Sequence, residues 1–303
     1  MSRSPATGVS GARGARGARV NVERALERGR RALAARSGSD ARRESGFLLA
    51  GVLGVSPAVL WLDDQRQLSA PQLVEYERRL ERRAGGEPLQ YVEGRAAFRN
   101  LNLRVNRSVL IPRPETEQLV DRVLEWSAGR ADLSFLDIGT GSGAIALSLL
   151  TEGPFERGVT VDISADALKV AGQNAVEVGV ESRVDFRVGA FPDAVRRGER
   201  FHVIVSNPPY VALGEADGLP AEVRDWEPRE ALFAGPTGLE VIERIVEGAA
   251  AHLEPEGLLA LEVSPAIAEA AASGVRASGV FREPRVARDL AERARFILSE
   301  LSV

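Results

Sequence analysis

The chain has 303 residues, of which 44% are hydrophobic and 27% charged, a composition typical of a globular protein large enough for two domains. Its 39 basic and 43 acidic side chains give a net charge of -4, so no global positive field exists to hold a nucleic acid. Cysteine is absent, histidine occurs twice and no apolar run approaches ~20 residues, which argues against disulfides, thiolate chemistry, a His-rich metal centre and a membrane span.

The N-terminal leader is rich in arginine and contains no acidic residue before Glu23. Three Gly-Ala-Arg triplets run from Gly11 to Arg19, and such a composition cannot bury an apolar core. We therefore expect a disordered tail over residues 1–20. A transit peptide and an RNA-contacting arm are the two alternatives for a leader of this kind.

Residues 21–86 are predicted to form a small helical domain. This stretch is rich in Ala, Leu, Arg and Glu, and apolar residues such as Leu48 and Val52 recur at helical spacing. Ser69 stands just before Pro71, the arrangement of a capping residue and a proline at a helix start. Short helices joined by tight turns are expected.

Residues 87–113 are interpreted as a hairpin connector. The glycines and proline from Gly85 to Pro88 interrupt the helical pattern. From Phe98 to Ile111 apolar and polar residues alternate on both sides of Asn106-Arg107, which predicts a hairpin turning at that pair. A helix with an acidic first turn is then predicted from Glu115 to Trp126.

Residues 114–303 are predicted to form an α/β domain. Strand-like and helix-like runs alternate here, which favours a parallel sheet covered by helices on both faces. In such sheets ligands bind beyond the carboxyl ends of the strands. The runs are Leu133 to Ile138, Ala144 to Leu150, Gly158 to Ile163, Ala165 to Gly179, Val184 to Val188, Val203 to Ser206, Leu239 to His252 and Leu258 to Val263.

A glycine-rich loop follows the first strand of this domain. Glycines let a ligand approach the backbone closely, so this loop is a candidate cofactor site. The pattern also satisfies the dinucleotide-binding motif, and a tight turn that binds nothing is the plain alternative. The candidate residues are Gly139, Thr140, Gly141, Ser142 and Gly143.

Asp162 ends the second strand, about twenty residues after the glycines. A carboxylate at this place can accept both hydroxyl hydrogens of a ribose, which favours a cofactor that contains adenosine. The alternative is a surface aspartate near the start of the helix at Ala165.

The fourth strand ends in Asn207-Pro208-Pro209-Tyr210, which we predict to be the catalytic turn. Two adjacent prolines stiffen the backbone and remove two donors, so carbonyl oxygens stay exposed. The side-chain oxygen of Asn207 and the carbonyl of Pro208 can then hold the two hydrogens of a planar NH2 group, and Tyr210 can stack on that group. Such a grip aims a weakly nucleophilic nitrogen at an activated methyl group.

These residues resemble the HemK or PrmC family of protein-(glutamine-N5) methyltransferases, which modify peptide chain release factors. The catalytic turn is shared with enzymes that methylate DNA and RNA amino groups, so other segments carry the specific likeness. The string from Leu110 to Glu117 is close to a family signature. The connector at Pro88 to Gly94 with Phe98, and the later loop with Glu227-Pro228, Ala231-Leu232 and Gly235 to Gly238, are also similar.

The resemblance implies a cytoplasmic enzyme with a seven-stranded Rossmann-like methyltransferase domain, which ends in an antiparallel hairpin around Phe281 to Ile297. It implies that S-adenosylmethionine is held by Gly139 to Gly143, Asp162, Phe191 and Asn207, with Phe191 against the adenine. The helical domain would recognise the release factor, and the catalytic turn would receive the glutamine of its Gly-Gly-Gln motif. No metal, no membrane and no stable nucleic-acid binding are implied.

The chain departs from the family pattern at three places. Ala190 stands where the family usually has Asp, so one polar contact to the adenine can be missing. Glu292 replaces a usual glycine, and Ser264-Pro265 differs from the usual residues after the fifth strand. We expect altered loops at the last two places.

Three other functions compete with this interpretation. A DNA or RNA amino-methyltransferase would use the same catalytic turn, but the chain has no separate basic recognition domain. A nicotinamide dehydrogenase would explain the glycines and Asp162 but not the catalytic turn. A partner protein that binds the cofactor without catalysis is the third alternative.

Overall fold

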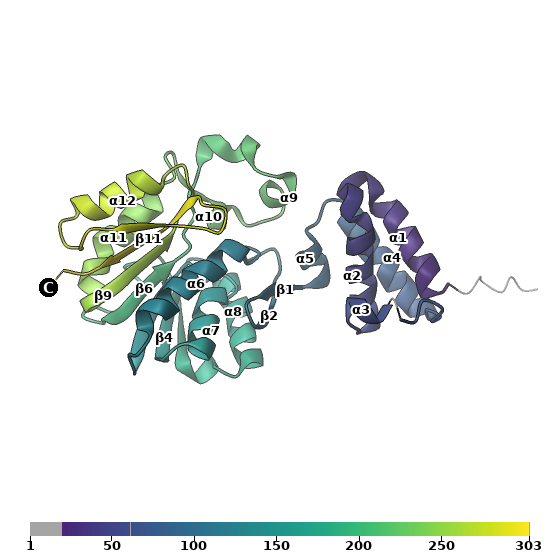
Figure 1. Ribbon diagram of the computed structural model, residues 1–303, viewed down its shortest axis with the longest axis horizontal. Helices are drawn as coiled ribbons and strands as arrows, with labels where there is room; N and C mark the ends of the chain where they lie inside the picture. The colour runs from purple at the N-terminus through teal and green to yellow at the C-terminus, as the bar shows by residue number, and fades with distance from the viewer. Residues whose placement is uncertain (1–19, 61, 303) are drawn as a thin grey trace, which may run out of the picture. The chain divides into compact units, whose positions relative to one another are not determined.

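The computed structural model describes residues 20–60 and 62–302 (Figure 1). The tail expected over residues 1–20 therefore falls outside the described residues, apart from Val20. The chain divides into two compact units, Met1–Gly85 and Gly86–Val303. Within the described ranges, no helix combines the length and the apolarity needed to cross a membrane.

The first unit is a bundle of helices whose ends are capped by side chains. The Asn21 side chain accepts from the backbone N–H of Arg24 at the start of α1, and Ser69 and Gln72 form a capping box on α4. Tyr76 is buried, and its hydroxyl donates to the carbonyl of Ser45. The helices are α1 (Val22–Ser37), η1 (Gly38–Asp40), α2 (Ala41–Leu53), α3 (Pro57–Leu60) and α4 (Ala70–Ala84).

The second unit alternates helices and strands. Its elements are α5 (Leu89–Glu93), β1 (Arg95–Phe98), β2 (Leu101–Arg104), α6 (Pro114–Ser127), β3 (Leu133–Ile138), α7 (Ala144–Glu152), β4 (Phe155–Asp162), α8 (Ala165–Val178), η2 (Glu181–Arg183), β5 (Val184–Val188) and β6 (Phe201–Ser206). They continue with β7 (Val211–Ala212), η3 (Leu213–Gly218), α9 (Ala221–Arg224), α10 (Arg229–Leu232), β8 (Phe233–Gly235), α11 (Glu240–His252), β9 (Leu253–Glu262), α12 (Ala268–Ala277), β10 (Arg285–Arg288) and β11 (Ala294–Glu300).

Seven of these strands form one sheet in the order β10-β11-β9-β6-β3-β4-β5 (Figure 1). Strands β9, β6, β3, β4 and β5 are parallel, whereas β11 runs antiparallel to both of its neighbours. The α/β fold expected from the sequence is confirmed, as is the antiparallel hairpin at the end of the chain. The strand order reverses between β3 and β6, so the carboxyl ends of these two strands make the crevice in which such sheets bind ligands.

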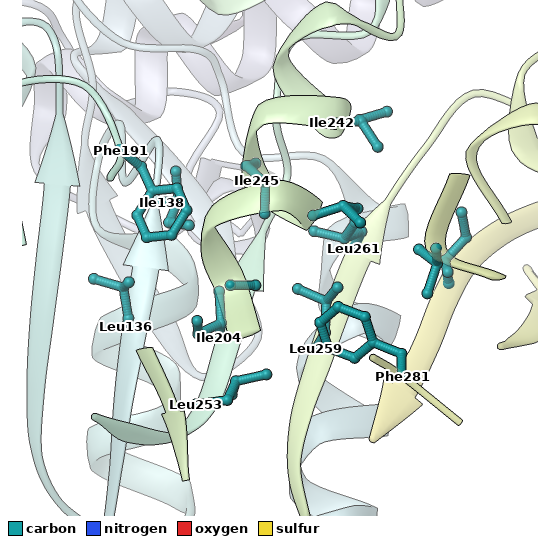
Figure 2. Close-up of a cluster of buried hydrophobic side chains, with 14 of the residues drawn as sticks. Leu136, Ile138, Phe191, Ile204, Ile242, Ile245, Leu253, Leu259, Leu261 and Phe281 are labelled. Atoms are coloured by element: carbon teal, nitrogen blue, oxygen red, sulfur yellow. The ribbon is translucent and has the colours of Figure 1, made fainter. Parts of the chain in front are cut away.

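Both faces of the sheet are buried, each under its own helices. Leu136 and Ile138 of β3 join a cluster with α11 and α12, and Figure 2 shows Ile242 and Ile245 of α11 among the strand residues of this cluster. Phe135, which directly precedes Leu136 and so points to the other face in the alternating pattern, belongs to the opposite cluster with α6 and α7. This double burial explains why the strands read as nearly continuous apolar runs in the sequence.

The turn of the connector hairpin was predicted at the wrong place. Strands β1 and β2 pair antiparallel from Arg95–Arg104 to Phe98–Leu101, so the turn lies at Arg99-Asn100 and not at Asn106-Arg107. Arg99 takes a positive φ of 51°, and its guanidinium donates to Glu152 and Asp121. These contacts, from residues 22 and 53 positions away, hold a turn that local sequence does not favour.

Gly158 of β4 provides a test of the packing between the paired strands β3 and β4. A Cβ atom added to Gly158 would lie 2.2 Å from the Phe135 ring, whereas one added to Gly172 of α8 would meet nothing within 4 Å. We expect Gly158→Ala to lower the free energy of unfolding by about 1–3 kcal/mol through overpacking. Gly172→Ala, the matched control, should raise it by about 0.5–1 kcal/mol because alanine favours a helix interior. Urea denaturation of both variants checks this, and equal effects would contradict the packing described.

Candidate active site

The glycine-rich loop connects β3 to α7 in a backbone conformation that favours glycine. Gly139, Gly141 and Gly143 have φ values of 74°, 54° and 86°. A Cβ atom at Gly139 or Gly141 would meet nothing within 4 Å, whereas one at Gly143 would press on Leu147. The first two glycines therefore leave open space beside the backbone, and the third allows α7 to pack closely.

Asp162, at the end of β4, is tied to this loop. Its two carboxylate oxygens accept from the backbone N–H groups of Gly141 and Ser164, each at 2.9 Å. Burial raises the pKa of Asp162, and these two hydrogen bonds oppose the rise. Each oxygen keeps a further lone pair, so the carboxylate can still accept hydrogen bonds from a ligand.

Asp137 lies directly beneath the loop and is fully buried. Its Oδ2 accepts a hydrogen bond of 2.6 Å from the hydroxyl of Thr140. Burial raises the pKa of Asp137 to about 7, and the negative charge of Asp162 adds to the rise. This carboxyl group thus supports the loop from inside the protein.

A cavity opens over the carboxyl ends of β3, β4, β5 and β6. Of the residues predicted from the sequence, Gly139, Gly141, Asp162, Phe191, Asn207, Pro208 and Pro209 line it. Thr140, Ser142, Gly143 and Tyr210 do not, and the first two of these are buried. Ala190 lies in the cavity wall beside Phe191, where the family pattern expects an aspartate.

Asn207 is held by a hydrogen-bonded chain that sequence reasoning missed. Its Nδ2 donates to the hydroxyl of Thr116 at 3.0 Å, and that hydroxyl donates to Oε2 of Glu262 at 2.8 Å. Thr116 lies in the first turn of α6, and Glu262 is the last residue of β9. Among the described residues, none donates to Oδ1 of Asn207, so this oxygen remains available as an acceptor.

A second cavity meets the first at the catalytic turn. Leu110, Asn207, Pro208 and Ala231 line both, while Tyr210 lines only the second. Tyr210 is partly buried, and its burial together with the charge of Glu262 raises its pKa to about 12. The Asn207-Pro208 segment therefore separates two cavities, and each cavity can hold one of two ligands.

Some lining residues gave no signal in the sequence. Glu230 and Arg244 reach the first cavity from α10 and α11, and Ser108 and Val109 reach it from the connector. Glu262 could have been found, because it ends a strand at the edge where ligands bind. Among the described residues, no group of three or more His, Asp and Glu side chains could hold a metal ion.

Known proteins match this chain along nearly its full length. Residues 24–94 match the family model described as the PrmC N-terminal domain, and residues 116–219 match the methyltransferase small domain. The release factor glutamine methyltransferase of Koribacter versatilis is 37% identical over 82% of this chain and 89% of its own length. The enzyme of the same name from Moorella thermoacetica is 39% identical over 92% of this chain and 98% of its own.

The chain belongs to the release factor glutamine methyltransferase family. The resemblance seen in the sequence is thereby confirmed. At the level of the fold, this family member is similar to the 16S rRNA N2 G1207 methyltransferase of T. Thermophilus, solved with AdoMet and guanosine. That likeness has a TM-score of 0.51 and 20% identity over 68% of this chain and 49% of the other.

The buried Asp137 makes a prediction about stability and pH. Its folded pKa lies above the unfolded value, so the folded state holds a proton that the unfolded state releases, and stability falls as pH rises from about 4 to about 7. Asp137→Asn keeps an acceptor for Thr140 but cannot ionise. We therefore expect Asp137→Asn to become more stable relative to the parent as pH rises over that range, because only the parent loses stability when Asp137 ionises. A difference that does not change with pH would contradict the assignment.

Proposed function

We propose that this protein transfers a methyl group from S-adenosylmethionine to the side-chain amide nitrogen (N5) of the glutamine in the Gly-Gly-Gln motif of peptide chain release factors. The observation that carries this proposal is the match to the Moorella relative over 98% of that protein's length, which includes both the helical and the catalytic units. A DNA or RNA substrate is not favoured, because the relatives that match most of this chain carry the name release factor glutamine methyltransferase.

The first cavity fits the cofactor. Gly139 and Gly141 leave room for a ligand against the backbone, and Asp162 has acceptors free for two ribose hydroxyls. Phe191 offers an aromatic ring in the wall where the adenine would lie. S-adenosylmethionine bound here supplies an electrophilic methyl group on a sulfonium ion. The alanine at position 190 leaves the edge of the adenine without a carboxylate partner from that position.

The catalytic turn supplies the grip on the nucleophile. Asn207 Oδ1 and the Pro208 carbonyl accept the two hydrogens of the glutamine NH2 group, and the adjacent prolines keep these acceptors rigid. An amide nitrogen is a weak nucleophile because its lone pair is delocalised, so fixing its position contributes much of the rate. Tyr210, in the second cavity, stacks on the planar amide.

The helical unit is the proposed recognition module for the release factor. Its span corresponds largely to residues 24–94, which match the PrmC N-terminal domain. Residues 87–113 form the connector, and residues 114–303 the catalytic domain. We further propose that the enzyme acts in the cytoplasm, where a translation protein is available as substrate, and binds no nucleic acid stably.

The substrate can be tested directly. Purified protein and methyl-labelled cofactor are incubated with release factor, with a release factor whose Gly-Gly-Gln glutamine is replaced by alanine, and with DNA or RNA. We expect label on the intact release factor alone. Label on nucleic acid, or on the release factor without its glutamine, would overturn the proposal.

Two variants should separate the two roles in the site. Asn207→Ala is expected to lower kcat by about 100-fold with little change in cofactor affinity, since it removes an acceptor that acts on the nucleophile. Asp162→Ala should weaken S-adenosylhomocysteine binding by about 1–3 kcal/mol.

Titration calorimetry and initial rates measure both effects. Asp166→Ala is the matched control for Asp162→Ala, since Asp166 pairs with Lys169 on the exposed face of α8. Normal methylation by Asn207→Ala, or unchanged affinity in Asp162→Ala, would refute the corresponding role.

A further inference from the structure

The hydrogen-bonded chain behind Asn207 joins three separate parts of the sheet domain. It runs from Asn207 after β6 to Thr116 on α6 and then to Glu262 at the end of β9. Thr116 is 4% exposed and Glu262 1%, so water does not compete with either hydrogen bond. Burying a carboxyl group costs free energy unless the group is hydrogen-bonded or paired, so Glu262 is a candidate for a role in the site.

The direction of each hydrogen bond follows from the number of hydrogens present. Thr116 has one hydroxyl hydrogen, and it is donated to Glu262. Toward Asn207 the hydroxyl can therefore only accept, so the group that faces it must be the NH2 of the carboxamide. The carbonyl oxygen of Asn207 is then turned to the other side.

We propose that Thr116 and Glu262 are positioning residues, in which ionised Glu262 orders the Thr116 hydroxyl and this hydroxyl holds the Asn207 carboxamide with its oxygen toward the substrate. This inference rests on the proposed function, because it needs Oδ1 of Asn207 to accept a hydrogen of the glutamine amide. Neither Thr116 nor Glu262 touches the reacting atoms. Both act through Asn207.

The ionisation state of Glu262 controls this orientation. A protonated Glu262 can donate its own hydrogen to the Thr116 oxygen, and the hydroxyl hydrogen is then free to turn toward Asn207. A hydroxyl that donates favours the carboxamide oxygen, so Asn207 would rotate and present NH2 to the substrate. That group cannot accept a hydrogen bond, and the grip on the nucleophile would be lost.

The charged and titratable groups around Glu262 come from several elements. Arg295 of β11 and Arg113, just before α6, favour the ionised form, whereas Glu115 of α6 opposes it. Tyr210 of the catalytic turn faces Glu262 and is neutral at physiological pH, since its own pKa is raised to about 12. Burial outweighs the favourable groups and raises the pKa of Glu262 to about 7, with the Thr116 hydrogen bond opposing the rise.

Because the ionised form is the productive one, kcat should be full at alkaline pH and fall as pH drops through the pKa of Glu262. Glu262→Gln keeps an oxygen that can accept from Thr116 but does not titrate. This variant should therefore keep kcat within a few-fold at pH 8 and lose the acid limb that Glu262 causes.

The test uses the full-length enzyme with release factor and measures kcat, cofactor affinity and the pH profile. Thr116→Val should lower kcat at least 10-fold without a change in S-adenosylhomocysteine affinity, and Thr116→Ser should restore it because the hydroxyl returns. Thr160→Val is the matched control: it removes a buried hydroxyl of β4 that has no hydrogen-bond partner among the described residues, and its kcat should equal that of the parent. Parental kcat in Thr116→Val, or a parental acid limb in Glu262→Gln, would overturn the proposal.

A second measurement needs no substrate. The side-chain NH2 signals of Asn207 in an NMR spectrum should be protected from solvent exchange, shift as Glu262 titrates, and lose both properties in Thr116→Val. If the enzyme fails to methylate release factor while these signals behave as expected, the proposed function fails and the positioning chain stands. If methylation proceeds and the signals ignore Glu262, the positioning chain fails alone.

Discussion

The hydrogen bond from Asn207 to Thr116 is the interaction on which the rest of the site depends. It joins residues 91 positions apart and fixes a carboxamide whose two ends look alike in shape but have opposite hydrogen-bonding roles. The prolines that follow Asn207 stiffen the backbone but leave the side chain free to rotate. Among the described residues the partner of Nδ2 is Thr116 of α6, and in our proposal this partner decides which end of the carboxamide meets a ligand.

The sheet brings the parts of this site together. Parallel pairing of β3 with β6 sets Ile138 opposite Ser206, and the Ser206 hydroxyl donates to the carbonyl of Ile138 at 2.6 Å. The glycine-rich loop and the catalytic turn begin immediately after these residues, so they face each other across the reversal in strand order. In the proposed function, a cofactor held by the first and an amide held by the second would meet at the boundary formed by Asn207 and Pro208, which line both cavities.

Patterns that depend on neighbouring residues could be predicted from the sequence, whereas contacts between distant segments could not. Burial on both faces explains the apolar runs of β3 and β6, and the positive φ values explain the glycines of the loop, so the fold and this loop could be predicted. The roles assigned to the glycine-rich loop and to the catalytic turn stay predictions. The turn at Arg99 was missed because ion pairs with α6 and α7 hold it. Glu292, at φ 60°, likewise occupies a backbone conformation that favours glycine, in a turn held by the side chain of Asp289. The position of Glu262 at the end of a strand could have marked it as a candidate, but its hydrogen bond to Thr116, 146 residues away, could not be predicted from the sequence.

A crystal structure of the enzyme with S-adenosylhomocysteine and a glutamine-containing Gly-Gly-Gln peptide is the most direct test of the central claim. We expect the glutamine amide nitrogen to lie about 2.7–3.2 Å from Oδ1 of Asn207, with Nδ2 still donating to Thr116. A bound glutamine that contacts neither Asn207 nor the Pro208 carbonyl, or an Asn207 side chain turned out of the site, would contradict it.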